Sequence, residues 1–227
     1  MKFNVILFDL DGTLIRIPKN FIEIINEIVL DVVIELGGKV SVDRINDLWI
    51  SNKNHREILS SWKIDKSDHS KFWKLFDEKE MEIRKNLVKS GEMRLYEDTL
   101  PVLKRLKEDK HIKLGVISNA SPKKANYELE VFNLQQYFDC KIFLGSISQD
   151  IAKPEPNGII QCLQELDTFI EHNNHVCYVG DSEIDILAGK RADIFSIYIV
   201  REHNNNVPKY QPDLIINSLF ELFQFLN

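Results

Sequence analysis

The chain has 227 residues, of which 44% are hydrophobic and 28% are charged, and its formal net charge at pH 7 is −6. These values are typical of a globular protein with one large domain, or with one domain that carries an insertion. The acidic balance argues against a general nucleic-acid binder, which usually carries a basic excess. No apolar run approaches the roughly 20 residues that a membrane-spanning helix needs. We therefore expect a cytoplasmic protein without a membrane partner.

The cysteines are odd in number and form no Cys-x-x-Cys pair. They are Cys140, Cys162 and Cys177. This pattern predicts buried thiols in a reducing compartment, and neither a disulfide framework nor a zinc site.

The chain begins with a short apolar run at residues 3–8 that predicts a buried strand. The run ends at two carboxylates, Asp9 and Asp11, which are followed by Gly12. Alternate residues of an extended chain point to the same side, so both carboxylates can face one point beyond the strand. Because they repel each other and have no basic neighbour, the pattern favours a hard cation between them.

An Asp-Gly pair can also be a simple hairpin turn. A hairpin would require a second strand directly afterwards, but the sequence reaches Pro18 and then a helical pattern. The choice between a turn and a cation site at Asp9 and Asp11 depends on the pattern of the remaining sequence.

A block of helices follows the first strand, because apolar residues recur there at spacings of three and four. The helices are expected at residues 21–33, 41–49, 55–62 and 70–89. No strand is predicted from Ile15 to Glu92. The many charges between Glu78 and Lys89 are interpreted as a solvated helix face.

Beyond Arg94, predicted strands alternate with predicted helices. The strands are expected at residues 112–117, 138–144, 176–179, 195–200 and 213–216. The helices are expected at residues 96–106, 123–133, 157–169, 183–191 and 219–226. This alternation predicts an α/β fold with a parallel sheet, in which ligands bind at the carboxyl ends of the strands. Polar residues follow three of the predicted strands: Asp9 and Asp11, Ser118 and Asn119, and Asp181.

Four motifs occur in order along the alternating part of the chain. They are the DLDGTL segment at residues 9–14, Ser118 after a strand, Lys153 before a helix, and the GDSEID segment at residues 180–185. With these motifs the chain resembles the haloacid dehalogenase superfamily, in its phosphatase branch with a helical cap similar to phosphoglycolate phosphatases. The resemblance implies a Rossmann-like parallel-sheet core at residues 1–15 and 93–227, and an inserted all-helical cap at residues 16–92.

The resemblance also implies catalytic roles. Asp9 is expected to be the nucleophile that forms an aspartyl-phosphate. Asp11 is expected to act as general acid and then as general base. Lys153 is expected to neutralise the phosphoryl charge.

A magnesium ion and a phosphate group are implied in the same way. Mg²⁺ would be held by Asp9, Asp11 through its backbone carbonyl, Asp181, and Asp185 through a water. The phosphate would be bound by Gly12, Thr13, Ser118, Asn119 and Lys153.

Each of these residues also has a structural interpretation. Asp185 fits a capping box with Ser182, and Ser118 fits a helix cap. Asn119 and Thr13 can belong to turns, and Lys153 lies on a polar loop where a lysine is usually solvated.

The expected cap offers several candidates for the substrate pocket. They are Arg16, Lys53, His55, Arg56, Trp49, Trp62 and Trp73. At helical spacing the tryptophans are more often packing residues than ligand contacts.

The leading hypothesis is a Mg²⁺-dependent phosphatase that acts on a small phosphorylated metabolite, as a monomer or weak homodimer. A β-phosphoglucomutase-like phosphotransferase is the first alternative. A 2-haloacid dehalogenase is disfavoured by Asp11, which such enzymes lack. A non-catalytic binding module is disfavoured because Asp9, Asp11 and Lys153 are all present.

Overall fold

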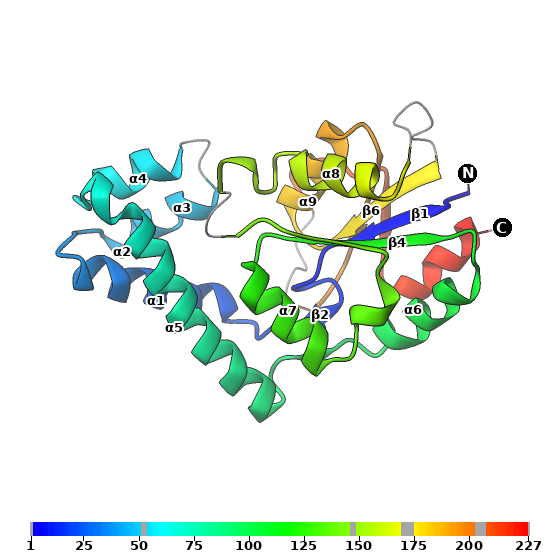
Figure 1. Ribbon diagram of the computed structural model, residues 1–227, viewed down its shortest axis with the longest axis horizontal. Coiled ribbons are helices and arrows are strands. Elements are labelled where there is room, and N and C mark those ends of the chain that lie inside the picture. Colours follow the sequence, from blue (N-terminus) through cyan, green and yellow to red (C-terminus); the bar gives the residue numbers. More distant parts are fainter. Residues whose placement is uncertain (1, 51–53, 146–148, 169–174, 203–207, 227) are drawn as a thin grey trace.

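A parallel sheet forms the centre of the molecule in the computed structural model, which describes residues 2–50, 54–145, 149–168, 175–202 and 208–226. Its strand order is β5-β4-β1-β6-β7-β8 (Figure 1). The strands are β1 (Val5–Phe8), β4 (Lys113–Ser118), β5 (Cys140–Phe143), β6 (Val176–Gly180), β7 (Phe195–Ile199) and β8 (Leu214–Ile216). All adjacent pairs are parallel, which confirms the predicted α/β fold.

The chain starts in the middle of this sheet and builds it in two directions. Strand β1 pairs with β4 on one side and with β6 on the other. From β4 the chain continues outward to β5, and then returns to β6 and continues to β7 and β8. Ligands of such sheets bind at the carboxyl ends of the strands where the order reverses. Here that point lies beside β1.

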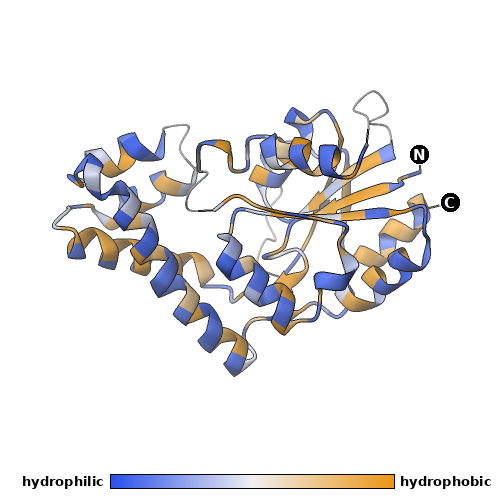
Figure 2. Ribbon diagram, in the orientation of Figure 1, coloured by the Kyte–Doolittle hydropathy of each residue, from blue (hydrophilic) through white to orange (hydrophobic). Residues whose placement is uncertain are grey.

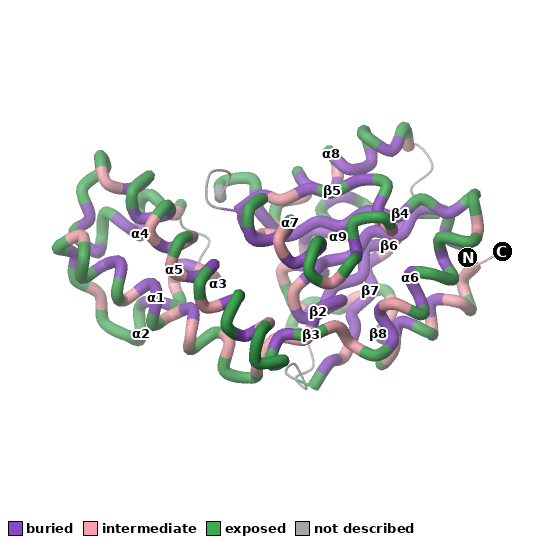
Figure 3. Tube along the Cα trace, turned by 60° about the horizontal axis from the view of Figure 1, so that its bottom comes forward, coloured by how far each residue is buried: buried purple, intermediate pink, exposed green. Residues whose placement is uncertain are grey.

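Alternate residues of β1 enter two different cores, one on each face of the sheet. Ile6 and Phe8 pack in the core that is covered by α6 (Thr99–Glu108), α7 (Pro122–Val131) and η5 (Leu219–Phe225). Val5 and Leu7 pack in the core that is covered by α8 (Asn157–Glu165) and α9 (Glu183–Arg191). Strands β1 and β6 are therefore buried along their whole length, between the two cores (Figures 2 and 3).

The final element differs from the expected α-helix, because η5 is a 3-10 helix. Its two buried residues, Leu219 and Leu222, are three positions apart. That spacing matches the three residues per turn of a 3-10 helix, which places both side chains on the core.

The helical block lies beside the sheet, at the left of Figure 1. It contains α1 (Phe21–Glu35), α2 (Val42–Ile45), α3 (Asp47–Ile50), α4 (His55–Ser61), the 3-10 turn η1 (Lys66–Asp68) and α5 (His69–Ser90). The helix expected at residues 41–49 is thus divided into α2 and α3. The helices have a hydrophobic core of their own, with Val29, Leu59 and Phe72 fully buried.

Two short strands join the block to the sheet domain, and the first of them corrects the expectation of no strand between Ile15 and Glu92. Strand β2 (Ile15–Arg16) pairs antiparallel with β3 (Arg94–Leu95), and Ile15 faces Leu95 in this ribbon. The chain therefore enters and leaves the helical insertion at one place. The division into a core and a cap at residues 16–92 stays a prediction.

Two further expectations concern the whole chain. The three cysteines are free and buried, as predicted. Among the described residues, no helix combines the length and the apolar character that crossing a membrane requires.

Candidate active site

The ends of three neighbouring strands meet at one cavity. Asp9 directly follows β1, Ser118 is the last residue of β4, and Asp181 directly follows β6. Because β1 pairs in parallel with both neighbours, these residues lie at the same edge of the sheet. They line a cavity of about 730 Å³ together with residues of the helical insertion. The predicted convergence at this edge is confirmed.

Three buried carboxylates form a cluster at the sheet edge. Asp9, Asp181 and Asp185 each offer an oxygen within 4.8 Å of the others, and their exposed fractions are 6%, 8% and 2%. Burial raises the pKa of the Asp9 carboxyl well above its ordinary value against the effect of Lys153, and Asp185 and Asp181 raise it further. Such a buried group of carboxylate oxygens fits a hard divalent cation, which would offset their repulsion.

Lys153 contacts this cluster directly. Its ammonium Nζ donates to Asp9 Oδ1 at 2.5 Å, to Asp185 Oδ1 at 2.7 Å and to the Tyr178 hydroxyl at 2.9 Å. Burial opposes its charge, but Asp185 and Asp9 raise the pKa of Lys153 well above its ordinary value. The side chain is only 3% exposed, so the interpretation as a solvated loop lysine is wrong.

The side chain of Asn119 holds Lys153 in place. Its amide Nδ2 donates to the backbone carbonyl of Lys153, and its Oδ1 accepts from the backbone N–H of Lys153, both at 2.9 Å. This reciprocal pair attaches the Lys153 loop to the end of β4. The amide of Asn119 is thus used for positioning Lys153, which the sequence did not indicate.

Asp185 combines the two roles that the sequence left open. Its Oδ2 accepts from the backbone N–H of Ser182 at 3.1 Å and completes a capping box at the start of α9. Its Oδ1 accepts from Lys153 and from the Tyr178 hydroxyl, the latter at 3.1 Å. The capping box at the start of α9 therefore fixes the orientation of the Asp185 carboxylate within the cluster.

Thr13 and Ser118 lie close to the same cluster. The Thr13 hydroxyl donates to Asp181 Oδ1 at 3.0 Å, and Thr13 is fully buried. The Ser118 Oγ accepts from the backbone N–H of Ala120 at 3.0 Å, and Ser118 lines the cavity. This bond leaves the hydroxyl proton of Ser118 unused, and a contact between Ser118 and phosphate stays a prediction. A contact between Thr13 and phosphate stays a prediction.

Gly12 allows Asp181 to approach the loop after β1. Its backbone has φ +85°, and a Cβ at this position would lie 2.5 Å from Asp181 Oδ2. Its N–H donates to the backbone carbonyl of Ile15 at 2.7 Å, so the turn uses this donor. Its expected contact with phosphate also stays a prediction.

We expect Gly12→Ala to lower kcat by at least about 10-fold, because the new methyl group displaces Asp181 from the cluster and the backbone stays in a left-handed conformation. Steady-state kinetics and a thermal unfolding curve would measure the effect. Gly91→Ala is the matched control, since Gly91 has φ +79° but no atom lies within 4 Å of the added Cβ. Equal kinetics for the two variants would contradict the role of Gly12.

Asp11 makes an ion pair that the sequence did not indicate. Its Oδ2 lies 2.7 Å from Nη2 of Arg84, a residue of helix α5 in the insertion. Its Oδ1 is buried and has no hydrogen-bond partner among the described residues. Arg84 therefore fixes one oxygen of Asp11 and leaves the other available.

Arg84 belongs to a buried charge network between α5 and α7. Its Nε donates to Glu80 at 2.8 Å, and its Nη1 contacts Glu128. Lys124 contacts Glu80 and lies 2.8 Å from Asp77. Burial raises the pKa of Glu128 to about 8.

This network corrects the interpretation of residues 78–89 as a solvated face at two positions, whereas Glu78, Glu82, Lys85 and Lys89 are exposed as expected. Glu80 and Arg84 are each 3% exposed. A signal was present in the sequence, because Phe72, Phe76, Glu80 and Arg84 follow one another at spacings of four residues. Glu80 and Arg84 therefore lie on the same buried face of α5 as Phe72 and Phe76, and not on the face that is exposed to solvent.

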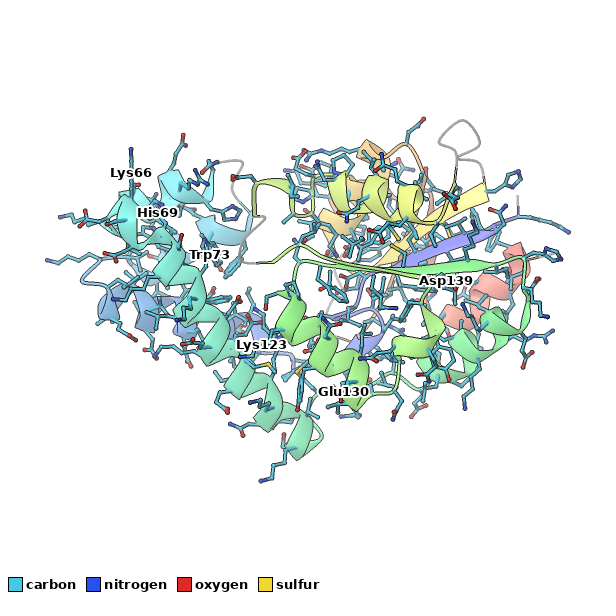
Figure 4. All side chains as sticks on the ribbon, in the orientation of Figure 1. Lys66, His69, Trp73, Lys123, Glu130 and Asp139 are labelled. Atoms are coloured by element: carbon cyan, nitrogen blue, oxygen red, sulfur yellow. The ribbon has the colours of Figure 1, made fainter. Side chains whose placement is uncertain are left out.

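The insertion supplies an aromatic wall to the cavity. Trp49, Trp73 and Phe76 line it, and Trp73 lies on the side of α5 that faces the sheet domain (Figure 4). His55 also lines the cavity, as expected, whereas Trp62 is only 3% exposed and packs in the core of the insertion.

Two further candidates from the insertion, Arg56 and Arg16, do not line this cavity. Arg56 is exposed to solvent. Arg16 lines a separate cavity of about 240 Å³ beside the β2–β3 ribbon. Lys53 lies outside the described residues.

Known proteins resemble the chain over its full length. A curated relative from Oceanobacillus iheyensis, named pyrophosphatase PpaX, is 26% identical over 98% of this chain and 96% of its own. Its counterpart from Anoxybacillus flavithermus is 27% identical over 100% and 98%. The crystal structure of a HAD phosphatase from Thermococcus onnurineus superposes with a TM-score of 0.63 at 27% identity, covering 99% of this chain and 97% of that one.

The family model for haloacid dehalogenase-like hydrolases matches residues 6–199. The match includes β1, the helical insertion and strands β4 to β7, and with them every residue of the carboxylate cluster. This chain is thus a haloacid dehalogenase-like hydrolase, an enzyme of a family of phosphatases.

Proposed function

We propose that the protein is a Mg²⁺-dependent phosphatase that hydrolyses a small phosphate monoester through a phosphorylated Asp9. The observation that supports it best is the meeting of Asp9, Lys153 and the carboxylates Asp181 and Asp185 in one cavity. Asp9 is the carboxylate that directly follows the central strand, and it faces Lys153. The insertion at residues 16–92 would act as the cap of this site.

The proposed reaction has two steps. A carboxylate oxygen of Asp9 attacks phosphorus, the bond between phosphorus and the ester oxygen breaks, and the leaving oxygen takes a proton from Asp11. Water then attacks the aspartyl-phosphate and gives a proton to Asp11, so that Asp9 and inorganic phosphate are released. The unpartnered Oδ1 of Asp11 is the oxygen that we assign to both proton transfers.

The remaining groups bind and balance charge. Lys153 lies on Asp9 and can neutralise the transferring phosphoryl group, while Ser118 donates a hydrogen bond to it. Asp9, Asp181 and Asp185, with the backbone carbonyl of Asp11, would hold Mg²⁺. When bound, the ion offsets the repulsion between an anionic nucleophile and an anionic ester. The wall of the insertion excludes bulk water from these groups.

We expect chelation to remove phosphate release and added Mg²⁺ to restore it, because the clustered carboxylates repel the phosphate without a cation. The measurement is phosphate release from a panel that contains acetyl phosphate, alkyl and aryl phosphates, glucose 1-phosphate and inorganic pyrophosphate. Pyrophosphate is included because curated relatives carry the name pyrophosphatase.

Three outcomes would contradict the proposal. Unchanged turnover in the chelator would exclude the metal. Release of chloride from a 2-chloroacid in the chelator would indicate a dehalogenase. Conversion of glucose 1-phosphate to glucose 6-phosphate without free phosphate would indicate a mutase.

A further inference from the structure

The cavity has two chemically different parts. The carboxylate cluster and Lys153 occupy the end at the sheet. Away from it, the insertion contributes an apolar and aromatic part of the wall, which consists of Phe21, Ile22, Ile25, Leu48, Trp49, Trp73 and Phe76. Polar and charged side chains of the insertion line the cavity beside this part, namely Asn54, His55, Asp77, Glu80 and Arg84.

Four rings that line the cavity, those of Trp49, His55, Trp73 and Phe76, form one continuous group. The ring of Phe76 lies 5.8 Å from that of Trp49 and 5.8 Å from that of Trp73, and His55 lies 5.8 Å from Trp73. These rings are fixed by contacts with each other, so they offer a pre-formed surface to a flat or apolar group. The volume of about 730 Å³ is in the range of pockets for small organic ligands.

Every lysine and arginine that the structure describes in the cavity wall already has a carboxylate partner. Lys153 contacts Asp9 and Asp185. Arg191 lies 2.5 Å from Glu155. These two residues belong to the sheet domain.

The other two basic residues, Arg84 of the insertion and Lys124 of α7, also have carboxylate partners. Arg84 contacts Asp11, Glu80 and Glu128. Lys124 contacts Asp77 and Glu80. Burial lowers the pKa of the His55 imidazole below its ordinary value, which disfavours its charged form.

A second anionic group on the substrate would therefore meet more carboxylates than cations near the wall of the insertion. Asp77, Glu80 and Asp150 all line the cavity there. Asp77 keeps 22% of its side chain exposed. These carboxylates would repel a second anionic group that is bound in the cavity, and the low-dielectric wall strengthens that repulsion.

We propose that this cavity selects phosphate monoesters whose leaving alcohol is uncharged and carries an apolar or aromatic body. This inference rests on the proposed phosphatase function and names its substrate class. The phosphate binds at the carboxylate cluster, and the body of the alcohol packs against Trp49, Trp73 and Phe76. Esters with a second anionic group, and inorganic pyrophosphate, are poor substrates.

The test compares two esters that share a benzyl ring and differ by one carboxylate substituent. Benzyl phosphate and 4-carboxybenzyl phosphate share the ring and the leaving oxygen, so we expect kcat/KM to be at least about 10-fold higher for the uncharged ester. Ethyl phosphate reports the contribution of the ring, and inorganic pyrophosphate is the second anionic substrate. Equal or faster hydrolysis of 4-carboxybenzyl phosphate or pyrophosphate would overturn the inference.

Two variants examine the causes separately. Asp77→Asn removes one of the carboxylates that pair with Lys124. It should therefore lower several-fold the ratio of kcat/KM for benzyl phosphate to kcat/KM for 4-carboxybenzyl phosphate. Glu78→Gln is the matched control, because Glu78 is exposed on the same helix and does not line the cavity. Trp73→Leu should lower the ratio of benzyl to ethyl hydrolysis. Unchanged ratios in Asp77→Asn and Trp73→Leu would overturn the assignment of this wall.

The two proposals fail differently. If Mg²⁺-dependent hydrolysis occurs but anionic esters are preferred, the inference on selectivity is wrong and the phosphatase function stands. If acetyl phosphate and every ester release no phosphate, the proposed function fails and the inference fails with it.

Discussion

Replacing Asp9 with asparagine is expected to lower kcat for phosphate esters by about 10⁴-fold or more, as is usual when a nucleophile is removed. The amide cannot attack phosphorus, and the site loses one of the three clustered carboxylates. Steady-state phosphate release at saturating Mg²⁺ measures the loss. No phosphorylated protein should form in the variant.

The same substitution should not destabilise the fold. Burial, Asp185 and Asp181 raise the pKa of Asp9 against the effect of Lys153, so the ionised carboxylate costs folding free energy at neutral pH. A neutral amide removes that cost, and Lys153 keeps Asp185 as a partner. In the absence of metal, we expect a Tm equal to or above that of the wild type.

Acid-quenched mass spectrometry separates the nucleophile from a mere ligand. The wild type should gain the mass of one phosphoryl group on the peptide that contains Asp9. Asp43→Asn, on the exposed surface of α2, is the control that should keep full activity. A phosphorylated peptide elsewhere, or turnover of Asp9→Asn at the wild-type rate, would show that Asp9 is not the nucleophile.

The second large effect is expected at Arg84. Its side chain is 4% exposed and contacts Asp11, Glu80 and Glu128. Arg84→Met leaves these carboxylates without their shared cation, so we expect the free energy of unfolding to fall by about 3–5 kcal/mol. Chemical denaturation measures this change. Arg105→Met is the control, because Arg105 is exposed and forms a surface ion pair with Glu108.

Activity should reveal a second consequence of Arg84. A displaced Asp11 no longer protonates the leaving oxygen well, and this matters most when the leaving group is poor. We therefore expect kcat for benzyl phosphate to fall about 10²-fold in Arg84→Lys, and kcat for 4-nitrophenyl phosphate to fall much less.

Arg84→Lys keeps the charge but cannot donate to three carboxylates with the same geometry. Asp11→Asn should show the same dependence on the leaving group. If both esters lose activity equally in Arg84→Lys, Arg84 stabilises the fold without positioning Asp11.

The alternation of strands and helices along the chain, and the convergence of Asp9, Ser118 and Asp181, could be predicted from the sequence. Buried parallel strands appear as short apolar runs, and parallel strands bring their carboxyl ends to one edge. The convergence of Asp9, Ser118 and Asp181 requires only this topology. Residues that belong to short motifs beside strands are therefore visible in a single sequence.

Contacts across long separations could not be predicted in the same way. Arg84 reaches Asp11 only because α5 packs near the sheet edge, and no local pattern fixes that approach. The Asn119 amide and the Tyr178 hydroxyl hold Lys153 through contacts that join distant segments. The β2–β3 ribbon has two residues on each strand, too few for a period to appear.

The pairing of Ile15 with Leu95 has an evolutionary and an engineering consequence. The ribbon holds the two ends of the insertion side by side. A change in the length or sequence of the insertion therefore costs the sheet domain little chain entropy. A shorter or unrelated segment can therefore be grafted at this ribbon while the strands that carry Asp9 and Asp181 keep their register. Because Arg84 comes from the exchanged part, a functional graft has to present a replacement cation to Asp11.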